Sequence, residues 1–256
     1  MVPDYFDMLS GFPIYIDGVG HIKSPLLKDL CPPDGLGNKG YNLYLNVLSW
    51  DKEAVIKYNM ALQIRGAEKL NRKELQTFDV ITFFDYTREL IIRVLSFFML
   101  ENLKWDQETR SILAFQQNEE SQELVGVITR DNYDDIRKLI LKLNYIGLSE
   151  EEAPVRHSSQ ASKDAWEKVQ EYLEKQAKKS EDKPEYHLSN IVSKLCACHP
   201  SYNLLNVYNL TIFQMYDAFF QLGFIRGSNL NERIFSQHGG KSFKFEEWLK
   251  PLIKNI

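Results

Sequence analysis

The stretch from Asn209 to Leu222, NLTIFQMYDAFFQL, constrains the fold of this chain more than any other. Thr211 suits the N-cap of a helix, because its hydroxyl can accept from the free amides of the first turn. Asp217 is the only charge behind that cap, whereas a surface helix normally keeps a charged face. We therefore expect either a central core helix or a helix that docks on a partner. Helical spacing places these residues on one face: Ile212, Met215 or Tyr216, Phe219 and Leu222.

A second apolar stripe lies off this face and begins with two phenylalanines seven residues apart. Two stripes need cover on two sides, and neighbouring helices of the same chain can cover one of them. Aromatic side chains are common in cores and also dominate the hot spots of protein interfaces. We expect the partner-binding residues to be Phe213, Phe220 and Phe224, and the core residues to be Ile212, Tyr216 and Phe219.

The composition is that of a globular protein, with 256 residues, 44% hydrophobic, 26% charged and a net charge of −4. The absence of a basic excess argues against nucleic acid as the main partner. Three cysteines, an odd number, favour a reducing compartment over a disulfide framework. The N-terminus lacks the pattern of a secretory signal. The long apolar segment from Phe78 to Leu100 is interrupted by charges, and its longest uncharged run, Val94 to Leu100, is far below the ~20 residues of a membrane span.

The N-terminal half combines helices with two small β elements, so we predict a mainly α-helical α+β fold. Asp17-Gly18 between apolar runs predicts a β-hairpin near residues 13–23 with a type I′ turn. Three short apolar runs near residues 103–128 predict an antiparallel meander. The predicted helices span Leu26–Leu30, Tyr41–Trp50, a segment capped by Asp51, a single long helix from Thr77 or Asp79 to about Glu101, and one that follows Asp131 and ends at Gly147.

The C-terminal half is predicted to be helical after a linker at residues 149–162, which is acidic and rich in serine. The predicted helices span Lys163–Lys179, His187–His199, the Thr211 segment, a short piece at Leu230–Phe235, and Phe245–Ile253. These patterns give an N-terminal domain at 1–148, a linker and charged helix at 149–184, and a helical module at 185–256.

Gly35-Leu-Gly-Asn-Lys-Gly40 matches the G-x-G-x-x-G pattern of dinucleotide sites. That mechanism needs a strand that leads into the loop, and Pro32-Pro33 stands there instead. We interpret the glycines as an irregular connection between helices. A nucleotide-binding regulator, or an enzyme with an unrecognised site, remains the alternative that this motif supports.

Cys196-Ala-Cys198-His199 contains residue types that bind metals. On a helix, the two cysteines point about 200° apart, so they cannot both face one ion. The histidines show no nucleophile or carboxylate partner in a recognisable arrangement. We therefore predict no metal, no cofactor, no catalytic residues and no enzyme activity.

Three segments together resemble tail-region proteins of phages that infect Gram-positive bacteria, a family of tail assembly or morphogenesis proteins. The first is FPIYIDGVGHIKSPLLKDL followed by YNLYLNVLSWDKE, and the second is NYDDIRKLILKLNYI. The third is YHLSNIVSKLCACHPSYNLLNVYNLTIFQMYDAFFQL, which follows the charged helix. The resemblance covers most of the chain through structural motifs and includes no catalytic signature.

The resemblance implies an assembly role without catalysis, as a tail assembly chaperone or as a structural component of the virion tail or baseplate. The implied partners are other phage structural or tail proteins, or further copies of the chain, with no nucleic acid and no membrane. The implied location is the host cytoplasm during assembly, or the virion itself.

Residues 149–162 give a prediction that limited proteolysis can test. Their acidic, serine-bearing composition offers too little apolar area to pack, so we expect trypsin or Glu-C to cut there first and leave two stable fragments. Mass spectrometry of the fragments locates the cuts. Equal protection along the whole chain would contradict the prediction.

Overall fold

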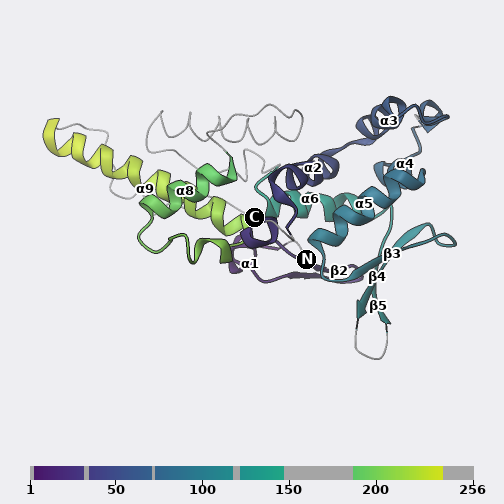
Figure 1. Cartoon of the computed structure of the whole chain (residues 1–256), viewed down its shortest axis with the longest axis horizontal. Helices are drawn as coiled ribbons and strands as arrows, with labels where there is room; N and C mark the ends of the chain where they lie inside the picture. The colour runs from purple at the N-terminus through teal and green to yellow at the C-terminus, as the bar shows by residue number, and fades with distance from the viewer. Residues whose placement is uncertain (1–2, 32–34, 71–72, 118–121, 147–186, 239–256) are drawn as a thin grey trace. The chain divides into compact units, whose positions relative to one another are not determined.

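The computed structural model describes residues 3–31, 35–70, 73–117, 122–146 and 187–238 (Figure 1). Helices dominate, and two small antiparallel sheets accompany them, which confirms the predicted α+β class. The chain forms two compact units, and each takes residues from discontinuous segments. Unit 1 contains residues 12–25 and 39–143, and unit 2 contains residues 2–11, 26–38 and 144–256. The predicted domain boundaries at 148 and 184 lie outside the described residues and stay predictions.

The helices of unit 1 surround a buried aliphatic and aromatic core. They are α2 (Gly37–Ser49), α3 (Lys52–Ala61), the 3-10 helix η2 (Ala67–Leu70), α4 (Thr77–Ile81), α5 (Asp85–Phe98) and α6 (Tyr133–Leu143). Asp51 caps α3 as predicted, since its carboxylate accepts from the amide of Ala54 at 2.7 Å. Side chains with no exposed area include Val47, Leu48, Val55, Ile91, Val94, Leu95, Phe98 and Ile140.

The predicted long helix from Thr77 to Glu101 is wrong, because α4 and α5 are separate helices. Phe84, the residue before α5, has extended backbone angles. The helix that begins with α4 therefore cannot continue into α5. The Thr82 hydroxyl donates to the carbonyl of Phe78 at 2.7 Å, and such bonds compete with the helical backbone pattern.

Two sheets lie in unit 1, and both were predicted. The hairpin pairs β1 (Ile14–Ile16) with β2 (Gly20–Ile22), and the meander has the order β3 (Asn102–Asp106), β4 (Ser111–Gln117), β5 (Gln122–Ile128). The hairpin turn differs from the predicted type I′, which needs positive φ at two residues. Here Gly18 has a φ of 71° and Asp17 does not have a positive φ.

A buried carboxylate fixes the hairpin to the end of α5. Both oxygens of Glu101 accept from the amide of His21, at 2.9 and 3.0 Å, and Nδ1 of the same histidine lies 2.7 Å from Oε1. The amide of Lys23 donates to the carbonyl of Phe98 at 2.8 Å, which continues the pairing. Gly20 makes this approach possible, since a Cβ there would lie 2.7 Å from the carboxyl carbon of Glu101.

Unit 2 is built around the long helix α9 (Ile212–His238), drawn in green to yellow in Figure 1. Thr211 caps it as predicted: its hydroxyl accepts from the amide of Gln214 at 3.1 Å, and the Gln214 side chain accepts from the Thr211 amide at 3.0 Å. This reciprocal pair is a capping box. The helix continues through Gly223, so the separate piece predicted at 230–235 belongs to α9.

The other elements in the described part of unit 2 are short. They are α1 (Tyr5–Ser10), the 3-10 helix η1 (Leu27–Leu30), α8 (Leu188–Cys198) and the 3-10 helix η4 (Val207–Asn209). The predicted helices at His187–His199 and near Leu26–Leu30 are thus present, the latter as a 3-10 turn. Ile191, Leu195, Val207, Ile212 and Met215 are buried between these elements.

Two predicted helix boundaries are corrected by the structure. The helix predicted from Tyr41 begins at Gly37, so the second half of the glycine motif forms its first turn. The helix after Asp131 ends at Leu143, and Tyr145 takes the left-handed conformation predicted for Gly147. The predicted linker 149–162 and the predicted helices at 163–179 and 245–253 lie outside the described residues. Among the described helices, none is long and apolar enough to cross a membrane.

Replacing Gly20 with alanine tests the contact with Glu101. We expect Gly20→Ala to destabilise the protein by about 3 kcal/mol, because φ is 119° and the new Cβ meets the carboxylate. Gly18→Ala is the matched control: its φ is 71° and no atom lies within 4 Å, so about 1 kcal/mol is expected. Urea unfolding measures both. Equal losses for the two variants would contradict the role of Glu101.

Candidate functional site

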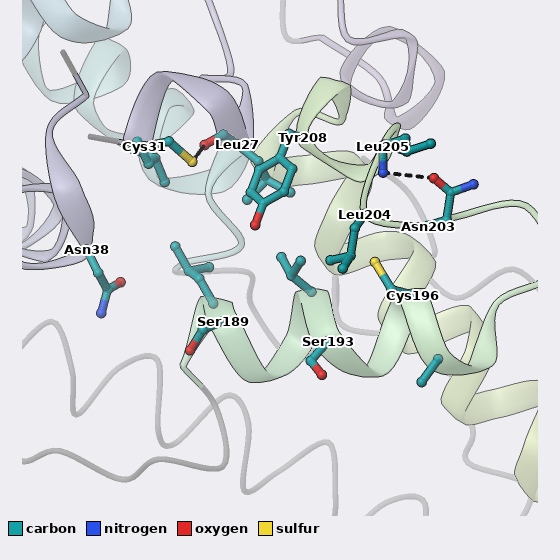
Figure 2. Close-up of a pocket in the computed structure, with 14 residues that line it drawn as sticks. Leu27, Cys31, Asn38, Ser189, Ser193, Cys196, Asn203, Leu204, Leu205 and Tyr208 are labelled. Carbon is teal, nitrogen blue, oxygen red and sulfur yellow. Dashed lines mark hydrogen bonds between the residues drawn. The ribbon is translucent and has the colours of Figure 1, made fainter. Parts of the chain in front are cut away.

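Unit 2 contains an open pocket of about 780 Å³ between α8 and the segments around η1 and η4 (Figure 2). Its volume falls within the range of about 300–1,000 Å³ that is typical of ligand sites. The lining residues are Leu27, Leu30, Cys31, Asn38, Leu188, Ser189, Val192, Ser193, Cys196, Ala197, Asn203, Leu204, Leu205 and Tyr208.

One side of the pocket is a face of α8. Its lining residues recur in adjacent pairs every four positions, from Leu188 to Ala197. That spacing places them on one side of a helix, while Ile191 and Leu195 turn into the core of unit 2. The pocket thus runs along the helix for about 13 Å, given a rise of 1.5 Å per residue.

Asparagine side chains shape the loop that forms another side of the pocket. The Asn203 carboxamide oxygen accepts from the amide of Leu205 at 2.8 Å, and that of Asn206 accepts from the amide of Asn203 at 2.9 Å. The Asn206 amide group also donates to the carbonyl of Ser201 at 2.9 Å. These local bonds fix a turn that needs no apolar anchor of its own, so its leucines are free to face outward.

The leucines at positions 204 and 205 are the most unusual residues of this site. Leu204 is 65% exposed and Leu205 is 92% exposed, although leucine is normally buried. Tyr208 adds a partly exposed aromatic ring beside them. Together with the apolar lining, they form a continuous apolar surface of the kind that marks an interaction site.

The pocket lining contains no lysine, arginine, histidine, aspartate or glutamate. Its polar groups are hydroxyls, carboxamides and two thiols. Cys31 donates weakly to the carbonyl of Leu27 at 3.5 Å, and Cys196 points into the space between α8 and the loop in Figure 2. Such a site suits an uncharged ligand, because a charge placed there would lose water without gaining a partner.

A second polar feature of unit 2 lies inside its aromatic core. Asp217 on α9 accepts from the hydroxyl of Tyr5 and from that of Tyr145, the latter at 3.3 Å. Burial raises the pKa of the Asp217 carboxyl group, and the two hydrogen bonds lower it in part. Burial, with the nearby Asp217 charge, raises the pKa of Tyr145 well above its usual value. The only charge of the Thr211 segment therefore links α9 to α1 and to Tyr145, two residues after α6.

The three predicted partner-binding residues differ in their burial. Phe213 has no exposed area and packs against Tyr5 and Tyr145, with ring centroids 5.9 and 4.8 Å apart. Phe224 is 8% exposed, and Phe220 is half-buried with its ring 5.5 Å from that of Tyr145. Partner binding by these residues stays a prediction, and a partner could reach Phe213 only if the neighbouring rings moved.

The pocket itself was not predicted from the sequence. One available signal was the Leu204-Leu205 pair between two asparagines. Asparagines favour a surface turn, and two adjacent leucines are not needed to form such a turn. Another was the four-residue spacing of small residues on α8. The segment from Leu27 to Asn38 carries no such signal, because it joins the pocket only through tertiary packing.

The residues weighed as metal ligands lie at the end of α8. His199 accepts from the amide of Ser201 at Nδ1, 3.2 Å away, and its ring stacks on that of Tyr202. Cys196 lines the pocket and Cys198 does not. In the part of the chain that the structure describes, no three His, Cys, Asp or Glu side chains form a group that could hold a metal ion.

Comparison with known families links the C-terminal part of the chain to phages. Residues 176–252 match the family model of the YomV second domain, a phage-derived family, which supports a phage origin. The match includes α8, the loop after it and α9. Comparisons with curated proteins and with solved structures find no match.

The raised pKa of Asp217 predicts a specific pH dependence. The folded protein holds this proton more tightly than the unfolded chain does, so this contribution to stability falls as the pH rises from about 3.8 toward the folded-state pKa. Asp217→Asn removes the titration. The stability of the variant relative to the wild type should therefore increase as the pH rises from about 4 to 7.5, as measured by urea unfolding at a series of pH values.

Asp106→Asn is the control for this measurement. Hydrogen bonds from Thr109 lower the pKa of Asp106, so its linkage has the opposite sign. The stability of this variant relative to the wild type should therefore not increase as the pH rises. A pH-independent difference for Asp217→Asn would contradict the predicted titration of the buried carboxyl group.

Proposed function

We propose that this chain is a non-enzymatic phage morphogenesis protein that acts through protein contacts, as a tail assembly chaperone. The observation that carries the proposal is the open apolar pocket of unit 2, whose lining includes the exposed Leu204 and Leu205. An assembly chaperone needs a surface that covers apolar segments of another protein before they reach their final place. The match to a phage-derived family supports the part of the proposal that assigns the chain to a phage.

The chemistry of the lining favours protein binding over nucleotide binding. A nucleotide carries phosphate charge, and phosphate sites in proteins supply cations or the amides of a helix N-terminus. The pocket offers no cationic side chain, and its longest side is the flank of α8. The glycine motif does not contradict this, because the described element directly before α2 is the 3-10 helix η1 and not a strand.

The proposed partners are other structural or tail proteins of the phage, and the proposed place of action is the host cytoplasm during assembly. A chaperone is present there and absent from the finished particle. A structural component of the tail or baseplate would remain in purified virions at fixed stoichiometry. Quantitative mass spectrometry of virions therefore separates the two roles.

A charge introduced beside the pocket tests the function. We expect Leu205→Asp to reduce the recovery of phage tail proteins in affinity capture about tenfold or more, since a central apolar contact typically contributes ~2 kcal/mol. Phage that carries the substitution should yield fewer complete tails by electron microscopy. Because the side chain is exposed, the melting temperature should stay within ~2 °C of the wild type.

Leu230→Asp is the matched control for this experiment. Leu230 is also exposed, at 59%, and lies on α9 outside the pocket. It should leave capture and tail assembly unchanged. Normal tails and undiminished capture with Leu205→Asp would reject the proposed function. Loss of capture in Phe220→Ala alone, with an unchanged melt, would place the partner on the aromatic stripe instead.

A further inference from the structure

The second half of α9 extends beyond the core of unit 2. Phe224 is 8% exposed, and none of the described side chains that follow it on the helix is buried. This part of the helix continues to His238, for about 21 Å at a rise of 1.5 Å per residue. A helix of this length is only marginally stable in water without tertiary contacts. Its formation therefore points to a further segment that packs on it.

Leu230 lies between two arginines on one side of this part of α9. Arg226 precedes it by four residues and Arg233 follows it by three, which is the spacing of neighbours on a helix surface. All three side chains are exposed, and the ion pairs of the described residues involve other groups. The complementary segment therefore has apolar side chains next to acidic ones.

The sequence that follows α9 has this chemistry. Residues 239–256 lie outside the described residues, and they begin with Gly239-Gly240. Glycine readily adopts the backbone angles at which a chain reverses direction. The segment Phe245–Leu249, FEEWL, has three apolar residues at helical spacing with two acids between them. Pro251 lies beyond this segment, so its missing N–H does not interrupt it.

The extent of the family match supports an association of the two segments. The match to the YomV second domain runs from residue 176 to residue 252. Both α9 and the FEEWL segment therefore fall within one domain of that family. The elements of a domain pack around a shared core, which favours a contact within the chain over one with another protein.

We propose that the chain reverses at Gly239-Gly240 and that the FEEWL segment packs on the side of α9 around Leu230. The segment is then an internal ligand, tethered at an effective concentration on the order of millimolar. A segment of another protein reaches this side of α9 only by displacing it. This inference does not depend on the proposed role in tail assembly.

The position of the turn determines which residues meet. In an antiparallel pair with equal rise, residues equally distant from Gly239-Gly240 face each other. Leu249 then lies against Leu230, and Glu246 lies opposite Arg233. An exposed ion pair contributes little to stability, so the apolar contact holds the segment and the charges select its register.

Alkylation of a cysteine placed on α9 measures this contact. The full chain with Leu230→Cys is treated with N-ethylmaleimide, and the rate at that position is followed by mass spectrometry. We expect Trp248→Asp in the same chain to raise the rate at least fivefold, because the charge removes the apolar cover. Ile225→Cys is the matched control. Ile225 is 51% exposed and points about 140° away from Leu230, so Trp248→Asp should change its rate less than twofold.

A disulfide tests the register. In a chain whose three native cysteines are replaced by serine, Leu230→Cys and Leu249→Cys should cross-link within one chain under mild oxidation. Ile225→Cys with Leu249→Cys should not cross-link. Non-reducing electrophoresis distinguishes a bond within one chain from a bond between two chains, and circular dichroism confirms the fold of each variant.

Other occupants of this side of α9 give different results. A cross-link between two chains, with a yield that increases with protein concentration, would place a second copy there and overturn the proposal. Equal alkylation rates with and without Trp248→Asp would also overturn it. A faster rate without the cross-link would overturn the assigned register. Leu230→Asp should release the segment and leave the pocket unchanged, so unchanged capture of tail proteins by that variant separates this inference from the proposed function.

Discussion

The structure of unit 2 depends on how other segments of the chain bury the apolar sides of α9. The first half of this helix is apolar on more than one side, and the chain covers it with its own N-terminal segments. Tyr5 donates to the buried Asp217, and the Gln214 side chain donates to the carbonyl of Leu9 at 3.0 Å. Gly11 passes so close that a Cβ there would lie 2.8 Å from the Gln214 side chain. Asp217 is thus the polar contact that fixes which segment covers the helix.

The same constraint positions the pocket. The amide of Leu27 donates to the carbonyl of Leu210 at 2.9 Å, immediately before α9 begins. This backbone bond holds η1 beside η4, and η1 supplies Leu27 and Leu30 to the lining. The pocket is therefore a consequence of how the start of α9 is covered. Its polar edges come from the ends of short elements, where backbone direction changes and side chains are not committed to the core.

Local signals in the sequence predicted most of the elements correctly. Thr211, Asp51 and the period-2 runs act through neighbours within a few residues, so they can be recognised without tertiary information. The break between α4 and α5 was missed, since the apolar spacing continues through Phe83 and Phe84 and no glycine or proline marks it. The continuity of α9 was missed for the opposite reason: Gly223 and Gly227 lower helix propensity, but they do not end a helix whose other residues favour it.

The candidate site could not be predicted in the same way, because it joins residues about 160 positions apart. Burial of Phe213 shows the same limit, since a spacing argument finds two apolar stripes but does not show which one the N-terminal segment covers. Phe213 is buried in part by Tyr5, and no sequence pattern around Tyr5 predicts this contact. Sequence reasoning correctly identified the helix that organises unit 2, and tertiary packing determined which of its faces remained available.

The family match gives this arrangement a further consequence. Residues 176–252 include α8 and the loop with Leu204 and Leu205, but not Leu27 to Asn38. The matched segment therefore contains the α8 side and the loop side of the pocket, while Asn38 and η1, with Leu27 and Leu30, come from outside it. The matched segment alone therefore supplies two sides of the pocket. The remaining side depends on the backbone bond between Leu27 and Leu210, which holds η1 beside η4.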